Sequence, residues 1–338
     1  DTDVMNELCS NLEMLMKKLY SKRLEHPNSF KKVWDLIHPS HYPLINGISQ
    51  NLQGSKFEIT EKYKSYKKER KQDFYLSRFQ IFESKYKWIP TIFNVSRNND
   101  TLEIVQKSYI NDLFIEDQKL KQDIEIEICK AFGYAYLLFS QLGIAMFCPY
   151  NNFSSKDLQV VVKSAYYELN PGETHEGVWH VEGMPDEHII MSSILYYQDD
   201  FEDATLELRR DVSEKEEKTR MMILPQKTVV DNKDSMLQEH LGYMKTEKGM
   251  MYAWPNSCQH RLMELKNTGA SIKKRSFIAF FLIDPDVKIV DTSMIKPQHE
   301  YINDEDSITN MVSLMEERRK VKVVLNKEVM SEISYCEH

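Results

Sequence analysis

The stretch from about residue 158 to 285 most constrains the fold, because it reads as a succession of short apolar strands with no helical segment between them. Val160–Tyr167 runs to the turn signal Asn170-Pro171-Gly172, and Ile189–Tyr197 runs to Asp199-Asp200. Further strands are predicted at Thr205–Val212, Gly249–Trp254 and Arg275–Ile283. Strands that follow one another directly predict an antiparallel barrel or jelly roll rather than a parallel sheet.

The segments on either side of these strands have helical periodicity. Residues 1–157 are predicted to be mainly helical and to pack on the core, because apolar residues recur there at helical spacing. The two stripes are Leu8, Leu12, Leu15 and Leu19, and later Ile124, Ile128, Ala131, Phe132 and Ala135. Residues 291–338 form a C-terminal extension with a helix from about Asp306. The chain is therefore predicted to be α+β, with a core at residues 158–290 and helical regions before and after it.

Charged segments interrupt this pattern in two places. Residues 213–248, with Glu214-Lys215-Glu216-Glu217-Lys218, are predicted to be a polar insertion between strands. A surface loop is its simplest interpretation, and a lid over the mouth of the barrel is the alternative. The run from Lys62 to Lys71 is interpreted as a solvated helix face rather than a binding patch.

Composition excludes several classes of protein. The net charge of −8 over 338 residues argues against broad nucleic-acid binding, which relies on phosphate neutralisation. It modestly favours a protein or peptide substrate of basic character, and a small-molecule substrate remains an alternative. No stretch approaches the roughly 20 apolar residues of a membrane span. The odd number of scattered cysteines predicts a reducing compartment, cytoplasmic or nuclear. Oligomeric state is left open.

Trp179-His180-Val181-Glu182-Gly183 and the later Gln259-His260-Arg261 carry the clearest chemical signal. Two histidines and one carboxylate are the ligand set of a facial triad, which holds a divalent metal and leaves positions open for substrate and oxygen. If residues 180–182 are in a strand, His180 and Glu182 point to the same side. Antiparallel pairing can bring His260 beside them. Imidazole and carboxylate ligands suit Fe(II), Mn(II) or Zn(II).

Arg275 opens the apolar strand that follows His260. A guanidinium can bind a carboxylate through two hydrogen bonds, so Arg275 is predicted to anchor a dicarboxylate cosubstrate whose other end chelates the metal. The alternative is that Arg275 is the last exposed charge of Lys273-Lys274-Arg275 before the buried strand begins.

Other residues near the motif are further candidates for the site. His188 could replace His260 in a local set with His180 and Glu182, but the strand that starts at Ile189 places it at the rim. The pocket is predicted to be lined by aromatic residues, with strand packing as the alternative: Tyr166, Trp179, Tyr252 and Trp254.

The set His180, Glu182, His260 and Arg275 resembles the iron- and 2-oxoglutarate-dependent oxygenases. More narrowly, the chain resembles family 4246 of the domains of unknown function. That resemblance rests on Trp179 to Pro185, Pro255-Asn256 with Gln259-His260-Arg261, and Phe280 to Pro285. Outlying segments extend it: Leu36 to Pro39, Leu314 to Arg318, and Cys336-Glu337-His338. The insertion at 213–248 does not carry it.

The resemblance implies a double-stranded β-helix core, cupin-like, with Fe(II) held by His180, Glu182 and His260. It also implies 2-oxoglutarate as cosubstrate, anchored by Arg275, and O2 as oxidant, with hydroxylation or demethylation of a substrate and release of succinate and CO2. Glutamate replaces the aspartate that is commoner in the wider superfamily. A zinc-dependent hydrolase with the same ligands, or a non-catalytic barrel that binds protein, remains an alternative.

Overall fold

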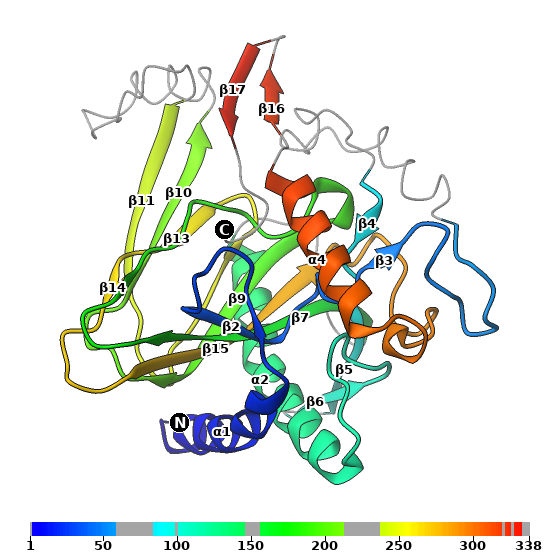
Figure 1. Cartoon of the computed structure of the whole chain (residues 1–338), viewed down its shortest axis with the longest axis horizontal. Coiled ribbons are helices and arrows are strands. Elements are labelled where there is room, and N and C mark those ends of the chain that lie inside the picture. Colours follow the sequence, from blue (N-terminus) through cyan, green and yellow to red (C-terminus); the bar gives the residue numbers. More distant parts are fainter. Residues whose placement is uncertain are drawn as a thin grey trace.

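The computed structural model describes residues 2–58, 84–98, 101–145, 156–212, 237–319, 322–325 and 328–332 (Figure 1). Its largest sheet has eight strands, and every strand pairing among the described residues is antiparallel. The order is β1 (Leu24–Glu25), β2 (Val33–Ile37), β7 (Lys156–Leu169), β15 (Lys273–Ile283), β9 (Ile189–Asp199) and β12 (Met251–Pro255). In addition, β5 (Thr91–Asn98) pairs with β7 and with β6 (Thr101–Gln106).

The second sheet has the order β11 (Leu237–Lys245), β10 (Thr205–Val212) and β13 (Gln259–Leu262). Its strand β13 contains the candidate metal ligand His260. Three shorter pairs complete the described strands. They are β8 (Thr174–His175) with β14 (Leu265–Lys266), β3 (Leu44–Ile45) with β4 (Tyr86–Lys87), and β16 (Lys322–Leu325) with β17 (Glu328–Glu332). Outside the named strands, an isolated bridge joins His180 and His260.

Helices cover one face of the large sheet. The helix α1 (Thr2–Met16) packs on β9, and α2 (Gln118–Ala145) packs on β9 and β12 (Figure 1). The remaining helical elements are η1 (Lys17–Lys22), η5 (Pro185–Glu187), η6 (Gln298–Glu300) and α4 (Asp304–Arg319). The predicted stripes of α1, η1 and α2 are buried, which confirms them as packing faces.

Side chains of β15 alternate between two hydrophobic clusters, because successive residues of a strand point to opposite faces. Ile278, Phe280 and Leu282 join the helix-side cluster, which contains the apolar stripes of α1 and α2. Phe277, Ala279 and Phe281 join the site-side cluster with Ala165 and Tyr167 of β7. Both faces of the strand are therefore buried, which explains why its sequence is almost continuously apolar.

The predicted strands of the core are confirmed, but two other predictions need correction. Residues 1–157 are not mainly helical: besides α1, η1 and α2, their described part contains the six strands β1–β6. Both β2 and β5 pair with β7, so this region supplies part of the large sheet. The sequence does not indicate β2 and β5 as strands, because their partner β7 lies far away in the sequence. The three-part division of the chain itself stays a prediction.

The segment 213–248 is only partly an insertion. Residues 237–245 form β11, which pairs with β10 along its length. The rest, residues 213–236, lies outside the described residues, as does the Lys62–Lys71 run. Hydrogen bonding joins the described strands into separate sheets and does not close them into a barrel.

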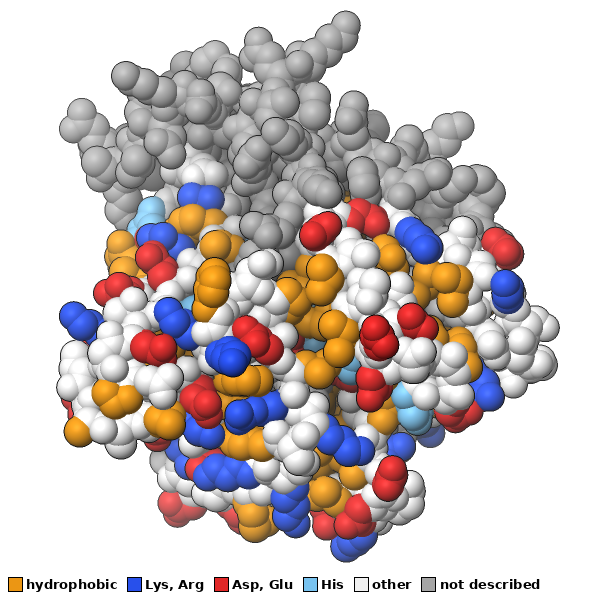
Figure 2. Space-filling view, in the orientation of Figure 1, with side chains coloured by type: hydrophobic (Ala, Val, Ile, Leu, Met, Phe, Trp, Pro, Cys, Tyr) orange, Lys and Arg blue, Asp and Glu red, His pale blue; other side chains and the backbone are white. Residues whose placement is uncertain are grey.

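No described helix combines the length and apolar character needed to cross a membrane. On the face shown in Figure 2, the described basic and acidic side chains are intermingled rather than gathered by sign.

Candidate metal centre

His180 and His260 are brought together by backbone pairing. His180 N–H donates to the His260 carbonyl at 3.1 Å, and His260 N–H donates to the His180 carbonyl at 3.0 Å. His260 lies in β13, opposite Leu208 of β10. The antiparallel pairing expected from the sequence is therefore confirmed, and it places two residues that are distant in the chain in direct register.

The side chains of His180, Glu182 and His260, here called the triad, converge on one point. Glu182 Oε1 lies 3.5 Å from His180 Nε2 and 3.4 Å from His260 Nε2. All three residues are buried, at 3%, 6% and 6% exposure. Ligand atoms this close together have the spacing that a single metal ion needs.

Residues 180–183 do not continue as a strand, which corrects the strand-based reason for pairing His180 with Glu182. The chain bends directly after the His180 bridge, and Gly183 has a φ of +66°. A Cβ at Gly183 would meet Ile189 Cδ1 at 2.5 Å and Glu187 Oε2 at 2.7 Å. Glycine is therefore needed here for both its backbone conformation and its lack of a side chain.

The protonation states suit metal binding. His180 Nδ1 lies 2.8 Å from the Val178 carbonyl, which can only accept, so Nδ1 carries the proton and Nε2 keeps its lone pair. Burial alone would raise the pKa of Glu182, but the contacts of its carboxylate with the imidazoles of His180 and His260 hold that pKa well below its usual range. The triad thus offers an ionised carboxylate beside the Nε2 atoms of two imidazoles.

Asn256 fixes the backbone of Glu182. Its Oδ1 accepts from Glu182 N–H at 3.0 Å and its Nδ2 donates to the Glu182 carbonyl at 2.7 Å. Ser192 of β9 donates to the same Oδ1 at 3.1 Å. Asn256 follows β12, so the amide links the triad to the large sheet. Its position after Pro255 marked a turn in the sequence, but nothing there indicated this role.

A buried ion pair supports the other end of the same loop. Glu187 Oε1 is paired with Arg318 of α4 and accepts from Trp88 N–H at 2.7 Å, while Glu187 Oε2 accepts from Met184 N–H at 2.7 Å. The Arg318 guanidinium carbon lies 4.2 Å from the centre of the Trp88 ring. Both charged residues are at most 1% exposed. The terminal helix is thereby tied to the loop that carries Glu182.

The triad faces a small cavity of about 30 Å³ between the two sheets. Besides the triad it is lined by Lys163, Tyr167, Ser193, Ile194, Tyr196, Leu206, Trp254, Leu262, Phe277, Ala279 and Phe281. Of the predicted lining residues, Trp254 is there, and its ring lies 4.7 Å from that of His260. The sequence did not indicate Lys163 as a cavity residue, because a single lysine in a strand is no sign of a binding site.

The other predicted lining residues lie elsewhere. Tyr166 is on the helix-side face of β7, stacked on Tyr20 at 4.5 Å. Trp179 lies between the guanidinium groups of Arg209 and Arg261, at 4.1 and 4.8 Å. Tyr252 packs on the site-side cluster and bonds to the Lys245 carbonyl. None of the three is among the residues that line the cavity.

Arg275 is fully buried and already has partners. Its Nη1 lies 3.1 Å from Asp199 Oδ2, its Nη2 bonds to Thr246 Oγ1, and its guanidinium carbon lies 3.9 Å from the centre of the Tyr196 ring. It shares a face of β15 with Phe277, but it does not line the cavity, whereas Tyr196 does. Its anchoring role stays a prediction that these contacts do not favour.

A second buried cluster, His26, Asp35 and His38, also brings three ligand atoms together. There His38 Nδ1 accepts from Ser40 N–H at 3.1 Å, and burial lowers the pKa of His38 to about 3, so the ring is neutral with its proton on Nε2. That tautomer offers no lone pair while the bond to Ser40 lasts. The triad fits a metal, whereas this cluster does not.

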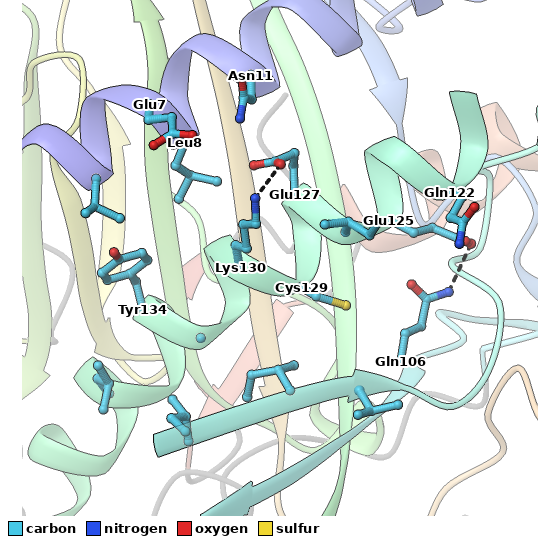
Figure 3. A pocket seen from close by; sticks show the side chains of 17 residues that line it. Glu7, Leu8, Asn11, Gln106, Gln122, Glu125, Glu127, Cys129, Lys130 and Tyr134 are labelled. Atoms are coloured by element: carbon cyan, nitrogen blue, oxygen red, sulfur yellow. Dashed lines mark hydrogen bonds and ion pairs between the residues drawn. The ribbon is translucent and has the colours of Figure 1, made fainter. Parts of the chain in front are cut away.

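A larger hollow shares no lining residue with the cavity at the triad. It has a volume of about 880 Å³ and lies between α1, α2 and β6. Figure 3 shows Glu7, Leu8 and Asn11 of α1 facing Glu127, Lys130 and Tyr134 of α2 across it. It is open and has no cluster of metal ligands, so we assign the site to the small cavity at the triad.

Comparisons with known proteins give a family and distant structural neighbours. No curated protein matches the sequence. IDO from Bacillus thuringiensis is 8% identical, with 58% of this chain and 73% of that one covered and a TM-score of 0.33. EvdO2 from Micromonospora carbonacea var. aurantiaca, complexed with 2-oxoglutarate, is 9% identical, with 64% and 79% covered and a TM-score of 0.27. AviO1 from Streptomyces viridochromogenes Tue57 is 11% identical, with 62% and 78% covered and a TM-score of 0.25. All three TM-scores are below 0.5, so they carry no weight in the assignment.

The family match is extensive. The model of DUF4246, described as a protein of unknown function, matches residues 1–133 and 140–306. The match spans the segment 213–248, to which the resemblance noted in the sequence did not extend. It ends before the two C-terminal segments that the resemblance included, Leu314 to Arg318 and Cys336-Glu337-His338. The matched residues contain the whole triad, Lys163 and Asn256. The chain belongs to the DUF4246 family.

Proposed function

We propose that this protein is a metal-dependent oxygenase that uses Fe(II), 2-oxoglutarate and O2. The observation that carries the proposal is the triad: two imidazoles and one ionised carboxylate converge in a buried cavity. Val178 orients the ring of His180, and Asn256 fixes the backbone of Glu182. Two histidines and one carboxylate leave metal positions for other ligands, as non-haem iron oxygenases require. A structural zinc site would instead use four protein ligands.

The arrangement of strands supports a double-stranded β-helix core. From β7 to β15, successive strands fall in the large sheet and the second sheet by turns: β9 is in the large sheet, β10 and β11 in the second, β12 in the large, β13 in the second and β15 in the large. The chain thus passes repeatedly between two antiparallel sheets, as two Greek keys of a jelly roll do.

Iron bound at the triad would supply oxidation of a C–H bond, coupled to conversion of 2-oxoglutarate to succinate and CO2. The residues of this chain supply the rest. Val178 holds the proton of His180 on Nδ1, and Asn256 fixes Glu182, so both ligands are oriented before metal binds. Leu206, Leu262 and Phe277 surround the cavity with apolar surface, which limits the access of water.

The substrate is proposed to be a protein, a peptide or a small molecule, hydroxylated or demethylated at carbon. Nucleic acid is disfavoured by the net charge of −8 and by the intermingled charges on the face in Figure 2. Cys9, Cys129 and Cys258 form no disulfide in the described part of the chain, which supports a reducing, cytoplasmic or nuclear location.

Metal-dependent turnover of 2-oxoglutarate tests the proposal. Succinate formation by the Fe(II)-loaded protein is measured for wild type, His180→Ala and His260→Ala, and both variants are expected to fall to background because each loses a metal ligand. His188→Asn is the matched control, since it removes a nearby histidine outside the triad while keeping a residue that tolerates the φ of +55° at that position. Turnover that persists in His180→Ala would rule out the triad as the centre.

A further inference from the structure

The hollow of about 880 Å³ between α1, α2 and β6, here called the groove, follows one face of α2. Its lining residues on α2 recur at helical spacing from Gln122 to Leu137, over about four turns or roughly 22 Å. Figure 3 shows α1 on one side of this face and the strand that carries Gln106 on the other. The face of α2 is therefore the floor of the groove, and α1 and β6 are its walls.

Exposed apolar side chains gather in the groove. Val4 of α1, Val105 of β6, and Ile126 and Leu137 of α2 all line it, and they are 47%, 38%, 45% and 38% exposed. Single apolar residues on a surface are common, but several around one hollow mark an interaction site. The packing of the described residues thus leaves apolar surface that a partner can cover.

Gly133 lies in the middle of the floor, between Ile126 and Leu137. Glycine inside a helix lowers the stability of that helix relative to alanine. The described packing does not require it, because a Cβ at Gly133 would meet Ile104 Cγ1 at 3.6 Å, an ordinary contact. The missing side chain deepens the groove at its centre, where a second helix could then approach α2 closely.

The charges of the groove favour a basic partner. Three carboxylates line it, and the only lining ammonium, Lys130, lies 2.7 Å from Glu127 Oε1. Glu7 and Glu125 have no ion pair in the part of the chain that the structure describes, although Glu125 accepts a hydrogen bond from the Gln106 amide at 3.0 Å. Two carboxylates beside exposed apolar side chains would attract lysine or arginine and repel an acidic partner.

We propose that the groove binds an amphipathic, basic helix of a partner protein. Apolar residues of that helix would cover Ile126, Gly133 and Leu137, and its cations would lie beside Glu7 and Glu125. The net charge of −8 disfavours a second copy of this chain as the occupant. The groove shares no lining residue with the cavity at the triad, so binding there does not depend on the proposed function.

Selection from a displayed library of random 16-residue peptides on the full chain tests the proposal. The enriched peptides are expected to have a net positive charge and apolar residues at helical spacing, and to gain helical circular dichroism on binding. Gly133→Leu should weaken their binding about 10- to 100-fold, because its side chain fills the floor. It should unfold at no lower temperature than wild type, since leucine is the better helix former.

The role of charge is tested with the same peptides. Glu7→Gln with Glu125→Gln is expected to weaken binding about 3- to 10-fold at low ionic strength and less at high salt. Glutamine at position 125 keeps an acceptor for the Gln106 amide. The matched control is Glu264→Gln with Glu305→Gln, which removes the same charge from two exposed positions outside the groove and should leave the affinity almost unchanged.

Several outcomes would overturn the proposal. They are enriched peptides that bind Gly133→Leu as tightly as wild type, enriched peptides that are acidic or gain no helix, and no enrichment at all. A dimer of wild type in light scattering that Gly133→Leu abolishes would assign the groove to a second copy instead. If Gly133→Leu does not fold, Ile126→Lys at an exposed position gives the same comparison, because its ammonium group repels a basic peptide.

Discussion

Gly183 lies between Glu182 and the buried carboxylate of Glu187, in a backbone conformation that side chains disfavour. Gly172 has a similar φ of +83°, but no atom lies within 4 Å of the place where its Cβ would be. The two glycines therefore separate the cost of the backbone conformation from the cost of a clash. They have the same local geometry and opposite surroundings.

We predict that Gly172→Ala lowers the free energy of unfolding by roughly 1–2 kcal/mol, the cost of the left-handed conformation. Gly183→Ala should cost roughly 1–3 kcal/mol more, because its Cβ must displace Ile189 and Glu187. Only Gly183→Ala should also weaken Co(II) binding. Urea unfolding and metal titration of both variants check this, and equal losses in the two would contradict it.

His38 makes the stability depend on pH. Burial lowers its pKa to about 3 from the ordinary value of 6.5. Between these values the unfolded chain binds a proton that the folded chain refuses, so stability is full above pH 6.5 and falls as the pH drops toward 3. The slope from this one residue is at most about 1.4 kcal/mol per pH unit.

We predict that His38→Asn flattens this part of the stability profile, because asparagine keeps an acceptor for Ser40 N–H but does not titrate in this range. Denaturant titration at several pH values between about 7.5 and 4 measures the free energy of unfolding and checks this prediction. A wild-type slope that survives in His38→Asn would assign the acid sensitivity to other groups.

Neighbouring tyrosines show how much of the site the sequence could predict. The chemistry of His180, Glu182 and His260 was visible, because those residue types in that order have few other uses. The face of a strand was not, because it depends on register: Tyr166 was predicted to line the pocket, whereas Tyr167 does. A shift of one residue moves a side chain to the opposite face. Lys163 was not predicted, because one lysine in a strand carries no signal of its own.

At the scale of elements, α4 and the triad loop are joined by the buried pair of Arg318 and Glu187. Glu187 also accepts hydrogen bonds from Met184 and Trp88, so its charge holds three segments together. Removing one partner of such a pair leaves an uncompensated buried charge, which costs far more than an exposed pair contributes.

We predict that Arg318→Met lowers the free energy of unfolding by about 3–5 kcal/mol and weakens Co(II) binding. Adding Glu187→Gln to it should restore part of both, since the lone charge is then gone. Lys119→Met, which removes an exposed pair with Asp123 on α2, is the control and should cost no more than about 1 kcal/mol. Additive effects in the double variant would contradict direct coupling between the two residues.

The core strands could be predicted and the N-terminal ones could not, for a physical reason. Strands after residue 158 are long apolar runs between turn signals, so their own residues reveal them. The strand β2 has five residues, and its partner lies far along the chain, with Val33 opposite Tyr167. Nothing local distinguishes such a segment from a loop, because its hydrogen bonds depend on β7 being in place.

At the scale of the whole molecule, the large sheet unites regions that the sequence suggested were separate. Strands β2 and β5 satisfy hydrogen bonds of β7, and α1 and α2 bury the helix-side face of β9 and β12. The core at residues 158–290 therefore depends on residues 1–157 for both backbone pairing and apolar cover.

We predict that a fragment of residues 158–290 does not fold alone, since the helix-side cluster would be exposed to water. Near-ultraviolet circular dichroism and binding of a hydrophobic dye should show a collapsed chain without fixed packing. Co-expression of residues 1–157 with a chain of residues 158–338, which keeps α4, should restore the native spectrum. A fragment with sharp cooperative unfolding of its own would show instead that residues 158–290 are an independent domain.

The link between Arg318 and Glu187 also sets an order of events during synthesis. All three triad residues leave the ribosome well before Arg318, and chains fold from the N-terminus as they emerge. Until α4 follows, Glu187 lacks its counter-charge and the loop carrying Glu182 lacks its support. A chain terminated before α4 is therefore expected to bind a metal at the triad poorly. The order of residues delays full support of the triad until α4 has been made.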